Sequence, residues 1–278
     1  MSTLTTHTTA SRDSHSEGLC KFNTTTKAIE VSDGTNWLVY DYDSAASLYS
    51  PVTNNLSLEL DGTDDHLDCG NDSALNLTSG FTINCYARQD DNGINTIVQR
   101  RTGSNGYQVT LNGGTFEYFG GAARNFGTGY TSTTAWYMLT VTHTGGANGT
   151  LKGYVNGSLV NTFTDTYTSL TSQNFYIGRN FAGNAYSHNG YIDEVGVWSS
   201  VLDADEISDI YNSGTPVDIS SSSNLIGYWR MGDGSGDTDS GSGAPADGDT
   251  VGTVKNLANP GTHDGTGSGG ALYSSTTP

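Results

Sequence analysis

Acidic residues gather in one short stretch near residue 60, and another aspartate stands far along the chain at position 193. Asp61, Asp64 and Asp65 follow a run of alternating leucines, and the dipeptide Asp61-Gly62 is a strong turn signal. Calcium in proteins takes about six to eight oxygen ligands, many of them carboxylates. Carboxylates that cluster at a turn can supply several of these ligands. The alternative is that the turn acids are only solvated and that backbone N–H groups satisfy Asp193.

The element expected to position Asp193 is a strand over residues 191–198. Apolar and polar residues alternate there, and successive side chains of a strand point to opposite faces. Strict alternation places Asp193 in line with Val195 and Val197, pointing into a core. A buried carboxylate is costly unless it is hydrogen-bonded, paired or bound to a metal.

The composition indicates an all-β protein. The 278 residues include 37 glycines, 5 prolines and 28 aromatic residues (16 Tyr, 8 Phe and 4 Trp), and short runs of alternating hydrophobicity recur between turn signals. The predicted strands cover residues 56–60, 81–88, 95–101, 107–112, 115–119, 136–143, 151–155, 158–163, 174–178, 191–198 and 224–231. Many short strands at this spacing predict a two-sheet antiparallel jelly-roll sandwich. One helix is predicted, with Asp203 as N-cap and Glu206 completing a capping box.

Charge and apolar pattern exclude several classes of protein. The formal charge is −18, from 29 acidic and 11 basic residues, and such a surface repels nucleic acid. No apolar run is long enough to span a membrane, and the first residues lack a recognisable signal peptide. The three cysteines are too few for a disulfide framework, so free thiols are expected.

The chain divides into five predicted segments. Residues 1–17 read as a flexible arm, 18–44 as a small β-hairpin module, and 45–55 as a linker. Residues 56–214 read as the main β domain, and 215–278 as a C-terminal segment with loops rich in Gly, Ser and Asp. A module of ~25 residues is below the ~40 at which chains usually fold unaided, so it is expected to pack on something else.

The small module carries the pattern G-x-x-x-F-N-T-x-T-K-x-x-E-V-x-D-G-x-x-W from Gly18 to Trp37. This pattern resembles the β-hairpin modules of phage tail-fibre and other virion surface proteins. The resemblance implies an attachment role, with other virion proteins as partners and a homo-oligomer, a trimer above all, as the assembly. The alternative is a generic β-meander at a domain edge.

The main domain carries a series of short motifs in a fixed order. They are L-D-G-x-D-D from Leu60, W-Y from Trp136, Y-V-N-G from Tyr154, I-G from Ile177 and G-x-I-D-E-V from Gly190. In this order they resemble the laminin-G-like, concanavalin A-like jelly roll. The resemblance covers more than half of the chain and implies two stacked, curved antiparallel sheets. The resemblance also implies a calcium site where the L-D-G turn meets the I-D-E strand, with Asp61, Asp64, Asp65 and Asp193 as the candidate ligands.

The C-terminal segment departs from that family pattern. A strand reading G-Y-W usually precedes the L-D-G strand in such domains, but here it follows the helix, at Gly227 to Trp229. The segment either folds back to complete its own sandwich or begins a second repeat or donates a strand to a neighbouring subunit. The first reading is favoured because it leaves no open edge.

The resemblance also implies carbohydrate binding. Exposed aromatic residues suit stacking on sugar rings, and Tyr118, Phe119, Tyr186 and His188 are the predicted glycan contacts. Core packing is the alternative for each of them. Catalysis is not expected. Retaining glucanases of this fold carry Glu-x-Asp-x-x-Glu, whereas here the run from Glu59 ends in aspartate, at Asp64. The shorter side chain would misplace the carboxylate, and a misplacement of ~1 Å can cost ~100-fold in rate.

Two functions remain open at this point. One is a phage virion structural protein, a fibre or a head or tail decoration, that displays the lectin-like jelly roll on the virion surface and contacts glycans. The other is a free lectin module of a cell-surface or secreted protein.

Overall fold

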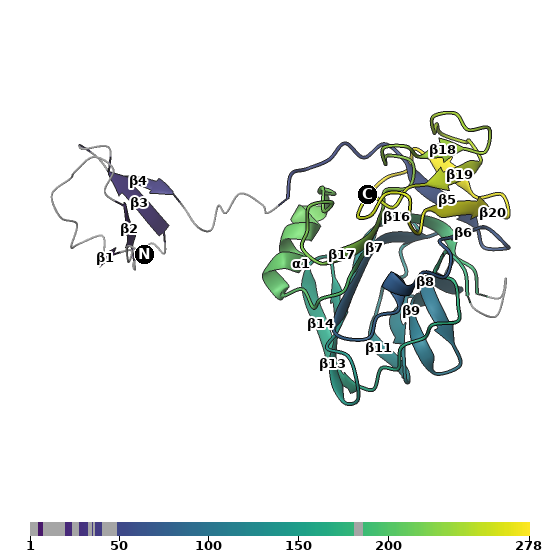
Figure 1. Cartoon of the computed structure of the whole chain (residues 1–278), viewed down its shortest axis with the longest axis horizontal. Coiled ribbons are helices and arrows are strands. Elements are labelled where there is room, and N and C mark those ends of the chain that lie inside the picture. Colours follow the sequence, from purple (N-terminus) through teal and green to yellow (C-terminus); the bar gives the residue numbers. More distant parts are fainter. Residues whose placement is uncertain are drawn as a thin grey trace. The chain divides into compact units, whose positions relative to one another are not determined.

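The computed structural model describes residues 49–180 and 186–278, and the backbone of residues 5–7, 20–23, 28–32, 35 and 37–40. The chain divides into two compact units, Met1–Tyr49 and Ser50–Pro278 (Figure 1). Each unit is described by itself.

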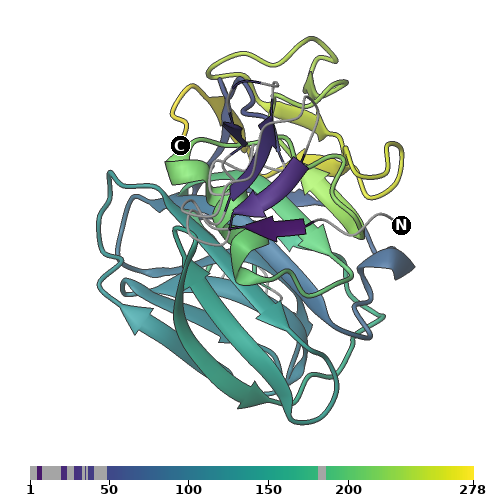
Figure 2. The same cartoon turned by 90° about the vertical axis from the view of Figure 1, so that its left-hand side faces the viewer.

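The first unit contains a four-stranded sheet (Figure 2, purple arrows). Its strands, in their spatial order, are β1 (Thr5–His7), β2 (Cys20–Asn23), β3 (Ala28–Ser32) and β4 (Trp37–Tyr40). The last three pair antiparallel, as the sequence predicts, whereas β1 pairs parallel to β2. Strand β1 departs from the flexible arm expected for residues 1–17, because its threonines suit a strand and β2 offers it an edge. The remainder of that arm lies outside the described residues.

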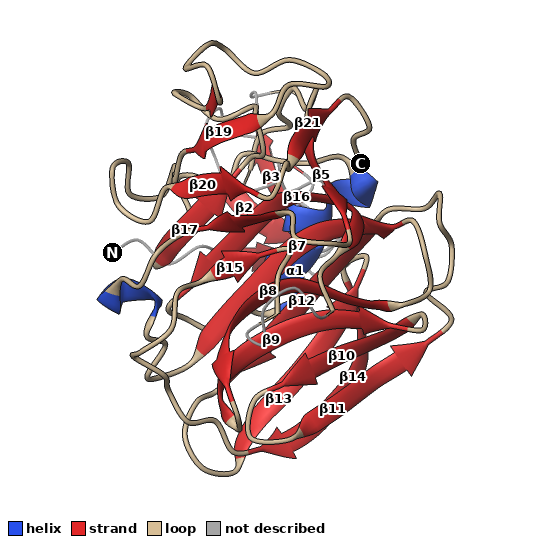
Figure 3. Cartoon of the chain, turned by 90° about the vertical axis from the view of Figure 1, so that its right-hand side faces the viewer, coloured by secondary structure: helices blue, strands red, loops and turns tan. Residues whose placement is uncertain are grey.

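The second unit is a sandwich of two antiparallel sheets, whose strands are red in Figure 3. The nine-stranded sheet has the spatial order β11 (Ala123–Thr128), β10 (Thr115–Phe119), β9 (Asn105–Asn112), β8 (Ile94–Thr102), β15 (Tyr176–Ile177), β6 (His66–Asp68), β20 (Gly265–Ser268), β19 (Val251–Val254) and β18 (Thr238–Asp239). The eight-stranded sheet has the order β14 (Ser158–Asp165), β13 (Gly149–Val155), β12 (Tyr137–His143), β7 (Phe81–Gln89), β16 (Asn189–Trp198), β5 (Ser57–Asp61) and β21 (Leu272–Ser274), and β17 (Leu225–Trp229) also pairs with β16. The predicted jelly-roll sandwich is confirmed.

The two sheets face each other across one hydrophobic core. Leu58 of β5, Ile83 of β7, Val141 of β12 and Ile177 of β15 are all fully buried members of it. Burying each such side chain stabilises the fold by about 1.5–3 kcal/mol. The polar residues between these positions are left on the outer faces of the sheets, which is where a binding site can form.

Strand β16 does not keep the strict alternation that the sequence suggests. Its pairing with β7 shifts register between Asp193 and Gly196, and Glu194 has a φ of +48°. Ile192 before this bulge and Val195 after it both lie in the core. A bulge inserts one extra residue and so changes the face of the residues that follow. The prediction that Asp193 lines up with the valines is therefore wrong: it pairs with Tyr86, on the face away from the core.

The C-terminal segment completes the sandwich of its own chain. Strand β17 pairs with β16, β20 pairs with β6, and β21 pairs with β5. The sequence predicts β17, but it does not predict β20 or β21. Gly265 and Gly267 of β20 carry no apolar signal, yet a Cβ on Gly267 would lie 2.2 Å from Val251 O, so these glycines are needed for close packing.

The contacts also define one helix and the start of the second unit. Helix α1 (Ala204–Tyr211) has the predicted capping box of Asp203 and Glu206 and buries Ile207 and Ile210. Residues 50–55, expected to belong to a linker, contact the main unit, since Val52 N donates to Pro216 O at 3.1 Å. Two short 3-10 helices, η2 (Ser73–Leu75) and η3 (Asn212–Gly214), complete the described elements.

Cys69 and Cys85 are both buried and unbridged, as expected. Burial raises the pKa of both thiols, so they stay protonated and unreactive. Among the residues that the structure describes, no helix has the length and apolar character needed to cross a membrane.

Candidate functional site

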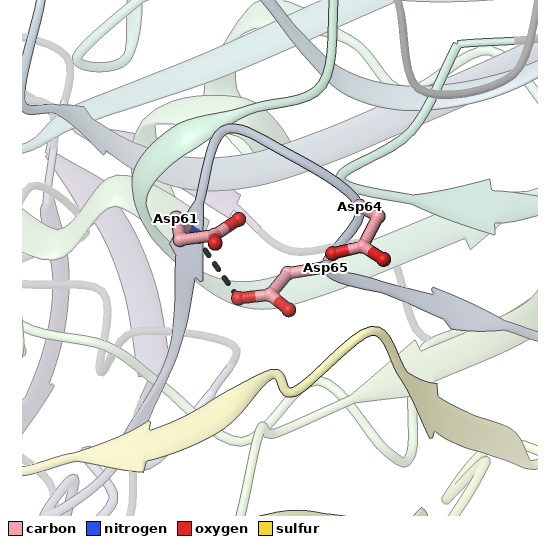
Figure 4. Close-up of side chains that lie close together, drawn as sticks. All are labelled: Asp61, Asp64 and Asp65. Atoms are coloured by element: carbon pink, nitrogen blue, oxygen red, sulfur yellow. Dashed lines mark hydrogen bonds between the residues drawn. The ribbon is translucent and has the colours of Figure 1, made fainter.

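The predicted calcium ligands at the start of the main domain do lie together. Asp61 ends β5, Asp65 precedes β6, and Asp64 lies in the turn between them (Figure 4). One carboxylate oxygen from each lies within 4.8 Å of the others. Gly62 has a φ of +75°, which lets the chain turn sharply at this point. We call these three residues the acidic turn.

The turn is held by hydrogen bonds of its own. Asp61 N donates to Asp65 Oδ2 at 3.1 Å, and Thr63 N donates to Asp61 Oδ1 at 2.7 Å. Burial raises the pKa of Asp65, and repulsion from Asp61 and Asp64 raises it further. A divalent cation would relieve this repulsion, and three carboxylates with water would satisfy part of the coordination that calcium prefers. The donor set of the turn therefore fits calcium.

Asp193 does not belong to the acidic turn. In the β16–β5 register Asp61 pairs with Asn189, four residues before Asp193. Asp193 Oδ1 accepts from the backbone N–H of Glu194, and its Oδ2 accepts from Asn54 Nδ2, both at 2.8 Å. Backbone and amide donors thus satisfy Asp193, so the four-aspartate site is corrected to three.

Glu194, the extra residue of the bulge, lies beside Asp193 and is also buried. Its carboxylate receives Arg230 Nε at 3.0 Å and the hydroxyl of Tyr228. Burial raises the pKa of Asp193, and the neighbouring Glu194 raises it further. Burial also raises the pKa of Glu194 to about 6, although Arg230 opposes the shift. We call Asp193 and Glu194 the buried acid pair.

Two of the predicted glycan contacts line one hollow on the outer face of the nine-stranded sheet. The hollow has a volume of about 310 Å³, and we call it the aromatic hollow. Phe119 projects from β10, and Tyr186 lies in the connection that precedes β16. The other lining residues are Ile94, Arg101, Gln108, Asn112, Glu117 and Asn180.

Polar groups of the aromatic hollow are fixed by one another. Gln108 Oε1 accepts from Arg101 Nη1 at 3.4 Å and from Asn180 Nδ2 at 3.3 Å. The Arg101 guanidinium lies 5.0 Å from the centre of the Phe119 ring. Aromatic rings beside preorganised donors and acceptors are what a sugar requires, because its ring has apolar faces and a polar edge.

A second hollow of about 320 Å³ shares Ile94 and Tyr186 with the first. Asp61 of the acidic turn and Asp91 both line it. Asp91 Oδ2 accepts from Asn189 Nδ2 at 2.7 Å, and this hydrogen bond lowers the pKa of Asp91, which keeps it ionised. Tyr186 therefore separates the aromatic hollow from an acidic one.

The other two predicted glycan contacts are wrong. Tyr118 is fully buried in the core, because the alternation of β10 turns Tyr118 inward and Phe119 outward. His188 is also fully buried, and its Nε2 lies 3.2 Å from the carbonyl oxygens of Arg88 and Tyr191. Burial lowers the pKa of His188 to about 4, so this imidazole is neutral.

Sequence reasoning missed the polar residues of the aromatic hollow. In β9 the core residues Tyr107, Val109 and Leu111 alternate with Gln108 and other outward polar residues. This polar half of the alternation was a usable signal. The contribution of Asn180 had none, because it depends on where the connection after β15 lies.

A family profile of the concanavalin A-like lectin/glucanases superfamily matches residues 61–208, which is more than half of the chain. The chain belongs to this superfamily. No curated protein matches the sequence.

Solved structures are similar in fold. A protein from Bacteroides ovatus ATCC 8483 whose assigned role is carbohydrate binding has a TM-score of 0.58 at 20% identity, over 81% of this chain and 60% of that one. The chain thus spans three fifths of that protein's length. Weaker similarity exists to a SAP-like pentraxin from Limulus polyphemus (TM-score 0.45, 13% identity, 58% and 84% coverage). It also exists to domain 4 of the Geobacillus stearothermophilus arabinanase AbnA with arabinotriose (0.45, 16%, 59% and 80%).

Proposed function

We propose that the second unit is a carbohydrate-binding module whose aromatic hollow receives a sugar ring. The observation that carries this proposal is the position of Phe119 and Tyr186 on one hollow, beside the hydrogen-bonded groups of Arg101, Gln108 and Asn180. The role assigned to the Bacteroides ovatus protein, which shares the fold, agrees with it. The module binds without turning over its ligand.

A glycan array followed by calorimetry tests the proposal. A glycan found on the array should bind Tyr186→Ala and Phe119→Ala about 3- to 10-fold more weakly, the range expected for the loss of one aromatic contact. Leu159→Ala is the matched control, because Leu159 is an exposed apolar residue of β14 in the other sheet. Equal affinity of all three variants would contradict the aromatic hollow as the binding site.

Calcium is proposed as an ion held by Asp61, Asp64 and Asp65. Their proximity and the raised pKa of Asp65 support it. A bound calcium would fix the turn that borders the acidic hollow, since Asp61 lines that hollow. Calorimetric titration of calcium into the wild-type protein and into Asp64→Asn measures the heat of calcium binding and tests this step separately from glycan binding.

The first unit is proposed to attach the binding module to a phage particle, as a fibre or a head or tail decoration on the virion surface. Its small four-stranded sheet forms a compact unit separate from the sandwich, which suits an attachment role. Other virion proteins are the proposed partners and a homotrimer the proposed assembly. Mass spectrometry of purified particles and sedimentation of the full chain test these two statements.

A free lectin module is the second candidate, because the site in the sandwich has the same geometry with or without a particle. Presence of the protein on purified virions contradicts this alternative, and its absence from them contradicts the first. Glycan binding itself is common to both.

A further inference from the structure

A polar cleft of about 700 Å³ lies on the outer face of the nine-stranded sheet, over strands β6 and β20, and shares no lining residue with the aromatic hollow. His66 and Asp68 of β6 flank the core residue Leu67, so both face outward. Their partners in β20 are Ser268 and Thr266, which line the cleft as well. The sheet thus presents four polar side chains in two neighbouring rows.

Arg179 provides a positive charge in this cleft. No carboxylate of the residues that the structure describes lies within 4.0 Å of its guanidinium, whereas Arg88, Arg124, Arg230 and Lys255 each have one. Arg100 and Lys152 likewise have no carboxylate this close among the described residues, but of these three cations only Arg179 lines the cleft.

The histidine beside Arg179 is neutral and orients it. His66 Nδ1 lies 2.8 Å from Asp64 O and therefore carries the proton, which leaves Nε2 to accept from Arg179 Nη1 at 3.1 Å. The guanidinium also lies 5.3 Å from the centre of the Tyr176 ring. These contacts hold the cation without neutralising it.

One ring nitrogen of a histidine in the cleft has no hydrogen-bond partner among the described residues. The side chain of His263 is 2% exposed, and within the described part of the chain its Nε2 has no hydrogen-bond partner. Its Nδ1 lies 3.3 Å from Asp72 Oδ2. A buried unsatisfied polar group destabilises a protein, and a ligand in the cleft could satisfy this one.

The acids that line the cleft are already occupied. Asp68 receives Asn174 Nδ2 on both of its oxygens, at 2.9 Å each, and Asp264 receives Lys255 Nζ at 2.7 Å. By contrast, no hydrogen bond between described residues uses the hydroxyls of Thr266 or Ser268. The cleft therefore offers donors in excess, which suits a ligand rich in acceptors.

We propose that the polar cleft binds a sugar that carries a carboxylate, of the uronic-acid class. The planar guanidinium of Arg179 matches a carboxylate with two parallel hydrogen bonds. The hydroxyls of Thr266 and Ser268 donate to the sugar oxygens. The inference extends the proposed carbohydrate binding to a second, separate site and rests on it only for the sugar part of the ligand.

The charge of the whole chain gives the proposal an unusual salt dependence. The formal charge of −18 repels an acidic sugar at long range, while Arg179 attracts it only at contact. The Debye length falls from ~30 Å at 0.01 M salt to ~8 Å at 0.15 M. Affinity for the acidic sugar is therefore expected to rise over this range, whereas binding to a diffuse basic patch would weaken.

Calorimetry with a galacturonate trisaccharide and its methyl ester tests the proposal on the full chain. The ester keeps the sugar rings and removes the charge. The acid is expected to bind about 10-fold or more tightly than the ester, and Arg179→Gln to weaken the acid about 10- to 100-fold, as for a lost charge-assisted hydrogen bond. The affinity of Arg179→Lys for the acid should lie between those of the wild type and Arg179→Gln, because lysine keeps the charge and loses the planar fork.

Lys152→Gln is the matched control, since it removes the same unit of charge from β13 in the other sheet. If Arg179→Gln does not fold, Thr266→Val replaces it, because valine has the same shape and lacks the hydroxyl. Equal binding of acid and ester, or equal losses in Lys152→Gln and Arg179→Gln, would overturn the proposal. Competition by inorganic sulfate at the same concentration would reduce the site to an oxyanion site and likewise overturn it.

The two binding proposals fail separately. Tyr186→Ala should leave galacturonate affinity unchanged while it weakens the ligand of the aromatic hollow. Binding of neutral glycans without binding of galacturonate would contradict only the cleft proposal. Binding of galacturonate without binding of neutral glycans would contradict only the aromatic hollow as a binding site.

Discussion

The acidic turn and the buried acid pair are both clusters of carboxylates, yet they differ in almost every physical respect. Asp61 and Asp64 are exposed and have no cation nearby in the described structure, whereas Asp193 and Glu194 are buried, and Glu194 is paired with Arg230. The acidic turn is open to solvent and can take up a cation from it. The buried acid pair is enclosed by protein atoms and is part of the structure of the sandwich.

The bulge in β16 explains why the sequence pattern misplaces Asp193. Alternation counted back from Val195 puts Asp193 on the core face, but the extra residue Glu194 between them shifts that count by one. Asp193 instead accepts from Asn54, and Glu194 pairs with Arg230. Aspartate thus occupies an exposed turn in one place and a buried, hydrogen-bonded position in the other.

The largest expected effect comes from breaking the buried pair. Arg230→Ala leaves Glu194 buried without its cation, and such a change typically lowers the free energy of unfolding by about 3–5 kcal/mol. Chemical denaturation measures it. Arg88→Ala is the control, because its pair with Asp90 is partly exposed and should contribute less than about 1 kcal/mol. Similar losses in both variants would remove the distinction between buried and exposed pairs.

The second-largest effect is expected from calcium binding to the acidic turn. At a calcium concentration of about 100 times the dissociation constant, binding should raise the free energy of unfolding by about 2.7 kcal/mol. Asp64→Asn should abolish this gain, and Asp193→Asn should keep it, because only Asp64 belongs to the acidic turn. Thermal unfolding with calcium and with a chelator is the measurement. A gain that depends on Asp193 instead would move the ion to the buried pair.

The pH dependence of stability follows from Glu194. Burial raises its pKa from 4.5 to about 6, so between these values the folded protein holds a proton that the unfolded chain has released. The free energy of unfolding therefore falls as the pH rises from 4.5 to 6, by about 2 kcal/mol from this group. The fall should be smaller in Glu194→Gln, where Asp193, whose pKa burial also raises, still contributes. The difference between the two pH profiles measures the share of Glu194. Parallel pH profiles would contradict the assignment.

The smallest effects are expected within the acidic turn in the absence of calcium. Asp65→Ala removes the acceptor for Asp61 N and should cost about 1 kcal/mol. Asp64→Asn is an exposed change and should stay within about 0.5 kcal/mol. Urea denaturation in chelator resolves the two. A larger loss in Asp64→Asn than in Asp65→Ala would mean that the turn is held together differently.

Much of the sandwich could be read from the sequence, because strand alternation and turn residues are local signals. The strand at residues 115–119, the helix after Asp203 and the acidic turn were all predicted at the right place. Strand β20 could not be, since Gly265 and Gly267 have no side chains to show a pattern. The aromatic hollow was half foreseen, through Phe119 and Tyr186, while Tyr118 and His188 were misplaced.

The amino-acid order alone settled the all-β class, the acidic net charge and the clustering of Asp61, Asp64 and Asp65 at one turn, because each depends on composition or on residues close along the chain. Folding decided which polar groups from distant parts of the chain line one cleft, as Arg179 and Thr266 line the polar cleft, and the bulge at Glu194 decided which of the residues after it face the core. These outcomes depend on register and on contacts between residues far apart in the chain, and no local pattern records either.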